Sequence, residues 1–215
     1  MAKRPAPPAP TTVLLVRHGQ TTTTGSILPG RAKGLHLAPV GQEQAARAAE
    51  RIASVGNIAA VYASPLERTR ETAAPIAKRL DLKVSIARGL IEADFGDWTG
   101  RKLSELMKLP EWRKVQSSPS TFRFPQGESF PEMQSRIVGA VDQLVAKHPG
   151  QRIVVVSHAD PIKALVAHAS GIHLDLFQRI VISPCSITPL LLGGDRPVVL
   201  AVNSTGEDLS TLAPS

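Results

Sequence analysis

Apolar residues recur along this chain with two periods, one typical of buried strands and one typical of helix faces. Short runs of branched apolar residues predict buried strands. These strands are expected at residues 13–16, 59–63, 84–87, 152–156, 180–192 and 198–203. Apolar residues three and four positions apart predict helices at residues 39–54, 66–80, 102–109, 131–147 and 161–170. This alternation of strands and helices indicates a soluble α/β protein.

The chain is long enough for one domain with a sizeable core. We expect a single domain over residues 12–203 of the 215, with a small cap at about 101–130 that decides substrate shape. Residues 1–11 are rich in proline and lack an apolar stretch, so they predict a disordered tail rather than a signal peptide. Residues 204–215 predict a loose tail.

The formal net charge of +7 would attract nucleic acid, anionic membranes or anionic metabolites. The basic residues are scattered and aromatic residues make up only 4% of the chain, which argues against a nucleic-acid surface. No apolar run reaches the roughly 18 residues that cross a bilayer, so we expect no membrane partner and a cytoplasmic location. The closing strands at 180–203 fit either a homodimer edge or the core.

Cys185 is the only cysteine, so the chain has no disulfide within itself. It lies in an apolar stretch without an obvious activating base. We expect a buried, inert thiol.

The first predicted strand ends abruptly in Arg17, His18 and Gly19. Ligands of open α/β sheets bind at the carboxyl ends of strands. Gly19 permits a sharp turn, and the guanidinium of Arg17 suits phosphate oxygens. A neutral imidazole beside such an arginine can attack phosphorus. Taken alone, the tripeptide is as compatible with a structural or solvated histidine as with catalysis.

Further candidate residues follow other predicted strands. His158 comes directly after the strand at 152–156, and Arg68 lies in the first turn of a helix that follows a strand. Glu92 lies between apolar residues, where partial desolvation would raise its pKa toward that of a general acid. Arg68 is equally compatible with surface ion pairs to neighbouring glutamates, and Glu92 with an exposed strand end. Arg31, in the loop at 21–38, would either reach a ligand or remain solvated.

Two histidines, two arginines and an acid at strand ends suit phosphoryl transfer without a metal. One histidine would attack phosphorus, the cations would hold its oxygens, and the acid would protonate the leaving alcohol. A metal site made of His18, His158 and a carboxylate is one alternative, and a nucleic-acid-binding module is another.

Five motifs give the chain a resemblance to a known family. They are L-V-R-H-G-Q-T, S-P-L-E-R-T-R-E-T, E-A-D-F-G-D-W-T-G, P-Q-G-E-S and V-V-V-S-H-A-D, in that order. In this order they resemble the histidine phosphatase superfamily, the phosphoglycerate-mutase-like proteins, over about residues 12–203. The stretches W-T-G-R-K and P-E-W-R-K-V-Q also resemble an actinobacterial subgroup labelled probable phosphomutases.

The resemblance implies a three-layer α/β/α sandwich with a mostly parallel central sheet. It implies His18 as the phosphorylated nucleophile and Glu92 as the proton donor. It also implies that three side chains bind the phosphoryl group: Arg17, Arg68 and His158. Facing a phosphate dianion, His158 would tend to be protonated.

Three positions affect how far the family pattern carries over. Thr24 stands where the family often has asparagine, and its shorter hydroxyl still suits a phosphate contact. Gln20 stands where many members have glutamate. Asp160 is a second candidate acid, because another branch uses an aspartate close after its second histidine.

We therefore expect a metal-independent phosphomonoester hydrolase that forms a phosphohistidine and needs no cofactor. Its substrate would be a small anionic phosphorylated metabolite. The alternative is a phosphoglycerate-type phosphomutase, which needs a closing cap with extra cationic contacts. The segment at 101–126 is short and its basic residues are spread out, which favours hydrolysis.

Overall fold

The computed structural model describes residues 9–206. Its centre is one six-stranded sheet with the order β3-β2-β4-β1-β5-β6. The strands are β1 (Thr11–Arg17), β2 (Ile58–Ala63), β3 (Val84–Ile86), β4 (Arg152–Ser157), β5 (Ile187–Leu192) and β6 (Val198–Val199). Strands β1 to β4 pair in parallel, whereas β5 is antiparallel to β1 and β6 is antiparallel to β5. The mostly parallel sheet that the sequence predicted is confirmed.

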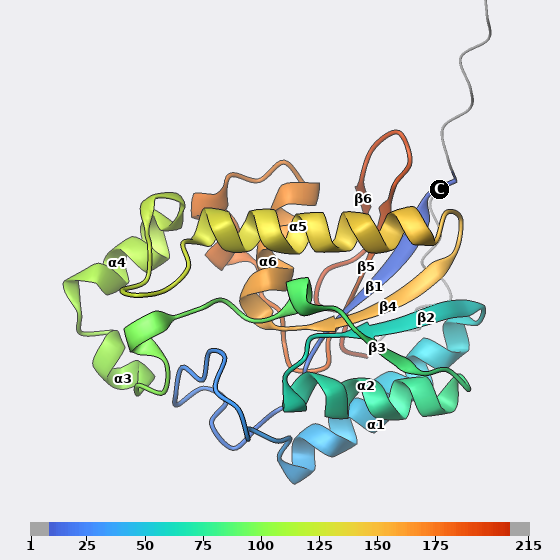
Figure 1. The fold of residues 1–215 in the computed structure, drawn as a ribbon, viewed down its shortest axis with the longest axis horizontal. Coiled ribbons are helices and arrows are strands. Elements are labelled where there is room, and N and C mark those ends of the chain that lie inside the picture. Colours follow the sequence, from blue (N-terminus) through green and yellow to red (C-terminus); the bar gives the residue numbers. More distant parts are fainter. Residues whose placement is uncertain (1–8, 207–215) are drawn as a thin grey trace, which may run out of the picture.

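Helices cover both faces of this sheet (Figure 1). The helices are α1 (Pro39–Val55), α2 (Glu67–Arg79), α3 (Leu103–Leu106), α4 (Pro110–Ser117), α5 (Phe130–Lys147) and α6 (Ala159–Ala169). Single turns of 3-10 helix occur at η1 (Arg88–Leu90), η2 (Gly96–Trp98) and η3 (Pro119–Thr121), and a longer one at η4 (Leu174–Arg179). Helices α1 and α2 pack on one face and α5 and α6 on the other, so the three-layer sandwich is confirmed.

Alternate side chains of the central strand β1 bind the two layers together. Val13 and Leu15 pack with α5 and α6, whereas Leu14 and Val16 pack with α1 and α2. All four are at most 2% exposed. Burial of one such side chain stabilises the fold by about 1.5–3 kcal/mol, so β1 and the equally buried β4 are the most firmly held elements.

Every Phe and Trp of the chain lies in one cluster beyond the end of the sheet. The cluster joins residues 95–130 to the start of α5 and to η4: Phe95, Trp98, Trp112, Phe122, Phe124, Phe130 and Phe177. Neighbouring rings lie 4.9 to 6.4 Å apart between centroids. Aromatic packing of this kind fixes the segment that the sequence assigned to a cap.

Several predicted elements differ in extent from the observed ones. Pro110 begins helix α4, where the sequence predicted no helix; proline suits this first helical turn. The strand expected at 180–192 begins only at Ile187. The backbone before it turns at Cys185, whose φ of 54° cannot belong to a strand. The strand expected at 198–203 is confined to Val198–Val199.

The domain also extends slightly beyond the predicted limits of 12 and 203. Thr11 belongs to β1 and donates a hydrogen bond to the carbonyl of His148 at 2.7 Å. Ser204 exchanges two backbone hydrogen bonds with Ile187. The rest of the two predicted tails, residues 1–8 and 207–215, lies outside the described residues.

Two glycines let the loop after β1 pack directly on α1. A Cβ on Gly41 would lie 2.1 Å from the carbonyl oxygen of Gln20, and one on Gly19 would lie 2.6 Å from the carbonyl oxygen of Gly41. Both contacts are with backbone, which cannot move aside as a side chain does.

The substitution Gly41→Ala should therefore destabilise the protein by about 1–3 kcal/mol, measured by urea unfolding. Gly139→Ala is the matched control, since Gly139 lies inside α5 with no atom within 4 Å of an added Cβ. Alanine there should stabilise the helix by about 0.5–1 kcal/mol. Equal effects of the two substitutions would contradict the proposed backbone contact.

Candidate active site

The register of β1 and β4 brings the two strand-end histidines together. Arg17 pairs with Ser157 in the parallel ladder, and the next residue of each strand is a histidine. The N–H of His18 donates to the carbonyl of Ser157 at 3.0 Å. The ring centroids of His18 and His158 lie 5.2 Å apart, and both side chains are buried.

His18 is held as a neutral ring with its Nε2 available. Its Nδ1 lies 2.8 Å from the carbonyl oxygen of Gly19, which can only accept, so the proton resides on Nδ1. Burial and the nearby guanidinium of Arg68 lower the pKa of His18 to about 3. A backbone acceptor on Nδ1 therefore leaves the lone pair on Nε2, the nitrogen that could attack phosphorus.

His158 is completely buried. Its Nε2 lies 2.8 Å from the hydroxyl of Ser64, whereas its Nδ1 has no hydrogen-bond partner and lies 3.9 Å from a carboxyl oxygen of Glu92. Burial, followed by the charge of Arg68, lowers the pKa of His158 well below its ordinary value. These surroundings by themselves therefore favour a neutral His158. A bound phosphate dianion would raise its pKa again and favour the protonated form.

Two arginines bring unpaired hydrogen-bond donors to the same place. Arg68 is 0% exposed at the start of α2; one guanidinium nitrogen donates to the carbonyl of Gly30 at 2.8 Å, while Nε and Nη1 have no partner. Arg17 donates from Nη1 to the carbonyl of Ile182 at 2.6 Å, and its Nε has no partner. Both arginines act electrostatically on His18, His158 and Glu92. Buried donors without acceptors are rare, and this set suits a tetrahedral oxyanion.

Glu92 is buried beside these cations, 8% exposed. Its Oε1 accepts a hydrogen bond from the N–H of Ala93 at 3.0 Å. Burial and the charge of Asp160 raise its pKa to about 7, against the opposing effect of Arg68. A carboxyl group with this pKa can donate and recover a proton near neutral pH.

Two other candidates, Asp160 and Thr24, have hydrogen-bond or ion-pair partners of their own. Asp160 lies on α6 with a carboxyl oxygen 3.3 Å from the ammonium group of Lys163, so its carboxylate is already paired. The hydroxyl of Thr24 accepts from the N–H of Thr21 and contacts the Thr21 hydroxyl, so the hydrogen bonds found for it stay within its own turn. A phosphate contact of Thr24 remains a prediction.

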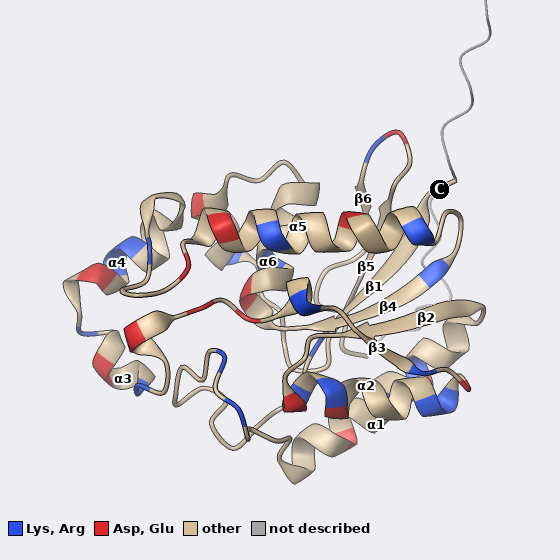
Figure 2. Cartoon of the chain, in the orientation of Figure 1, with Lys and Arg blue, Asp and Glu red and all other residues tan. Residues whose placement is uncertain are grey.

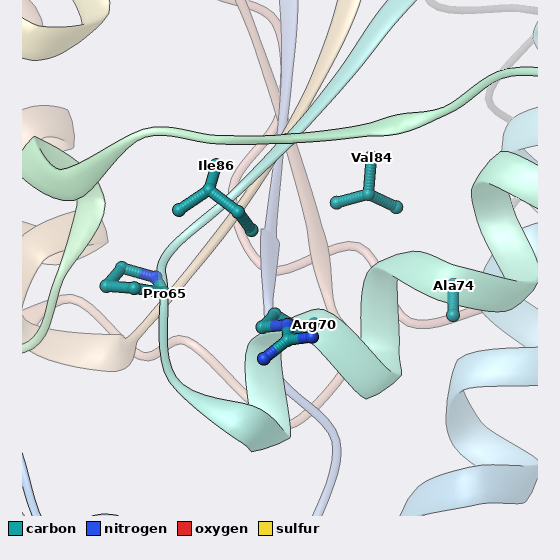
Figure 3. Close-up of a pocket in the computed structure, with 5 residues that line it drawn as sticks. All are labelled: Pro65, Arg70, Ala74, Val84 and Ile86. Atoms are coloured by element: carbon teal, nitrogen blue, oxygen red, sulfur yellow. The ribbon is translucent and has the colours of Figure 1, made fainter.

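Arg70, two residues beyond Arg68, is exposed. It lines a pocket at the outer edge of the sheet with Pro65, Ala74, Val84 and Ile86 (Figure 3). Arg68 and Arg70 are therefore separated: Arg68 is buried near the histidines, and Arg70 lies in the groove beside β3.

The charged residues in the described part of the chain form neither a basic face nor a metal centre. Lys and Arg are spread over helices and loops (Figure 2). Within residues 9–206, no three His, Cys, Asp or Glu side chains gather as ligands of an ion would. No helix among these residues is long and apolar enough to cross a membrane.

Comparison with known proteins identifies the family of this chain. The histidine phosphatase superfamily (branch 1) matches residues 13–205. The chain belongs to the histidine phosphatase superfamily. Its fold is that of the phosphoglycerate-mutase-like proteins, as the motifs implied.

Three similar proteins illustrate the range of this superfamily. The chain is 35% identical over 206 residues to the bifunctional protein Rv2228c of Mycobacterium tuberculosis, with 92% of this chain but only 55% of that protein covered. The chain thus spans about half the length of that relative. It is 32% identical over 198 residues to phosphoserine phosphatase 1 of Hydrogenobacter thermophilus, covering 90% and 92% of the two chains. The crystal structure of an Entamoeba histolytica phosphoserine phosphatase mutant with phosphoserine superposes with a TM-score of 0.82 at 28% identity, covering 91% and 98%.

Sequence reasoning missed two hydroxyl groups that hold this histidine phosphatase site in place. Ser64 contacts His158, and Thr72 accepts from the N–H of Gly19 at 3.0 Å while donating to the carbonyl of Arg68 at 2.7 Å. Thr72 stands four residues after Arg68, on the same side of α2, and this spacing was a usable signal.

Arg31 makes contacts that the sequence did not indicate. Its guanidinium pairs with Asp94 and Glu128 and donates to the carbonyl of Glu92, while its side chain is 32% exposed. The sequence could not show these ion pairs, because the partners lie 63 and 97 residues away along the chain.

The buried carboxyl of Glu92 has a consequence for stability. With a folded pKa of about 7 against 4.5, the unfolded chain loses this proton first, so folding loses stability as pH rises from 4.5 to 7. Glu92→Gln should raise the free energy of unfolding at pH 8 by about 1–3 kcal/mol and have little effect at pH 4.5. Urea unfolding at both pH values measures this. A Gln variant that is less stable at pH 8 would contradict the raised pKa.

Proposed function

We propose that this protein hydrolyses small phosphomonoesters through a phosphohistidine on His18. The observation that carries this proposal is the buried group of unpaired nitrogens on Arg17, Arg68 and His158 around a neutral histidine. The donors match the oxygens of a phosphoryl group, and the neutral imidazole supplies the nucleophile.

In the first step, Nε2 of His18 attacks phosphorus and the bond from phosphorus to the ester oxygen breaks. Glu92, protonated at this stage, transfers its proton to the leaving oxygen, so that an alcohol departs. The donors of Arg17, Arg68 and His158 compensate the charge on the equatorial oxygens. Because the pKa of Glu92 is raised to about 7, its protonated form is available near neutral pH.

In the second step, water attacks the phosphohistidine. The carboxylate of Glu92 accepts a proton from this water, the phosphorus–nitrogen bond breaks, and its electron pair returns to Nε2 of His18. Inorganic phosphate leaves, and both groups regain their starting protonation states.

Hydrolysis is favoured over a mutase reaction by the charges around residues 101–130. A mutase retains its phosphohistidine and gathers further cations over the site. Here Arg123 is paired with Glu132, and Arg101 is half-buried after η2. The remaining basic residues of the segment are exposed on α4 or beside α3: Lys102, Lys108, Arg113 and Lys114. The phosphatase names of similar proteins also support hydrolysis.

The direct test is phosphate release from a panel of phosphomonoesters in EDTA, including phosphoserine, phosphoglycerates, sugar phosphates and p-nitrophenyl phosphate. Wild-type protein should release phosphate from some of them, and His18→Ala should abolish release, since no other nucleophile replaces Nε2. Isomerisation of a phosphoglycerate without release would instead favour the mutase. Activity that needs a divalent metal would refute the metal-independent mechanism.

Arg68→Ala should lower kcat/KM by roughly a hundredfold, because one transition-state donor of this kind is worth on the order of 3 kcal/mol. Arg70→Ala is the matched control on the same helix and should leave kcat/KM unchanged, since Arg70 is exposed in the outer groove. Circular dichroism checks that both variants fold. A folded Arg68→Ala protein with full activity would remove Arg68 from the site.

A further inference from the structure

The segment that carries Glu92 has little regular structure of its own. Between η1 and η2, residues 91–95 form neither helix nor strand. The proposed proton donor must nevertheless be held in place, because a displacement of 1 Å in a reacting group can cost a hundredfold in rate. The contacts of this segment show what holds it.

Two arginines form hydrogen bonds with the backbone around Glu92. Arg31 donates from Nε to the carbonyl of Glu92 at 2.9 Å, and Arg136 donates to the same carbonyl at 3.3 Å. Arg136 also donates from Nη1 to the carbonyls of Gly89 and Ile91, both at 2.8 Å. The carbonyl of Glu92 and those of two residues before it are thus bonded to a side chain of helix α5.

One carboxylate orients both arginines. Glu128 accepts from Nε and Nη2 of Arg136, each at 2.8 Å, and from Nη2 of Arg31 at 3.1 Å. It also accepts from the N–H of Asp94 at 3.3 Å. The Glu128 side chain is only 13% exposed, so these charge-assisted bonds are shielded from water. Two-pronged pairing with Arg136 fixes the plane of that guanidinium.

The backbone around Glu128 is fastened to the same segment. The N–H of Glu128 donates to the carbonyl of Asp94 at 2.9 Å. A Cβ on Gly127 would lie 2.4 Å from that carbonyl oxygen, so only glycine permits this approach. The turn at 125–128 and the irregular segment 91–95 are therefore bonded to each other as one unit.

We propose that Glu128 is a positioning residue for the proton donor of this reaction, acting through Arg31 and Arg136 on the backbone of Glu92. The inference rests on the proposed function, since it assumes that Glu92 protonates the leaving group. Glu128 touches neither His18 nor His158 in these contacts, so it is a positioning residue and not a catalytic one.

This role makes a selective prediction about leaving groups. An alkyl phosphate such as phosphoserine needs a proton on its departing oxygen, whereas p-nitrophenyl phosphate releases a stable anion without one. Glu128→Gln keeps the shape but loses the charge that holds the two arginines. It should lower kcat/KM for an alkyl phosphate by about tenfold to a hundredfold, and for p-nitrophenyl phosphate by less than about threefold.

Two comparison variants sharpen this test. Glu92→Gln should show the same selectivity with a larger loss on the alkyl ester. Glu132→Gln is the matched control, since Glu132 is an exposed glutamate four residues further on that is paired with Arg123; both substrates should be unaffected. If Glu128→Gln fails to fold, Arg136→Lys, which keeps the charge but loses the two-pronged pairing, should show the same selectivity.

Equal losses on the two substrates would overturn the proposal, because they would assign Glu128 a purely structural role. An unchanged alkyl phosphatase activity would overturn it as well. If Glu92→Gln shows no selectivity, Glu92 is not the proton donor and the positioning role falls with it. Failure of the proposed function is distinguishable, since wild-type protein would then release no phosphate from either substrate.

Discussion

A set of buried nitrogens without hydrogen-bond partners, on Arg17, Arg68 and His158, is the constraint on which the rest of this structure depends. Arg68 is fully buried, and the unpaired nitrogens of Arg17 and Arg68 lie in the neighbourhood of the unpaired Nδ1 of His158. Leaving such groups unsatisfied costs free energy, which the firmly packed β1 and β4 and their flanking helices must offset. A cluster preorganised in this way is stabilised when an oxyanion supplies the missing acceptors.

Burial and neighbouring charges shift the pKa values of His18 and Glu92 in opposite directions. Burial and Arg68 lower the pKa of His18 to about 3, which keeps the imidazole neutral. Burial and Asp160 raise the pKa of Glu92 to about 7, which keeps its carboxyl partly protonated. One group is thereby made a nucleophile and the other an acid within a single site, and both states are available near pH 7.

The sequence predicted the sheet and its strand-end histidines because their signals are local. The buried runs before His18 and His158, and the helix start at Arg68, can be recognised from a few neighbouring residues each. It could not predict the pairing of Arg31 and Arg136 with Glu128, since a charged residue does not show which distant partner it meets. Nor could it place the strand start after Cys185, because a positive φ at a non-glycine residue depends on tertiary contacts.

The central claim about this site is that the phosphoryl group is transferred to Nε2 of His18. Rapid chemical quenching during turnover of p-nitrophenyl phosphate, followed by peptide mapping under conditions that preserve phosphohistidine, identifies that atom. With the Nδ1 proton of His18 held by the carbonyl of Gly19, the account predicts phosphate on Nε2 of His18. Phosphate on Nδ1 of His18, or on another side chain of the phosphorylated protein, would contradict it.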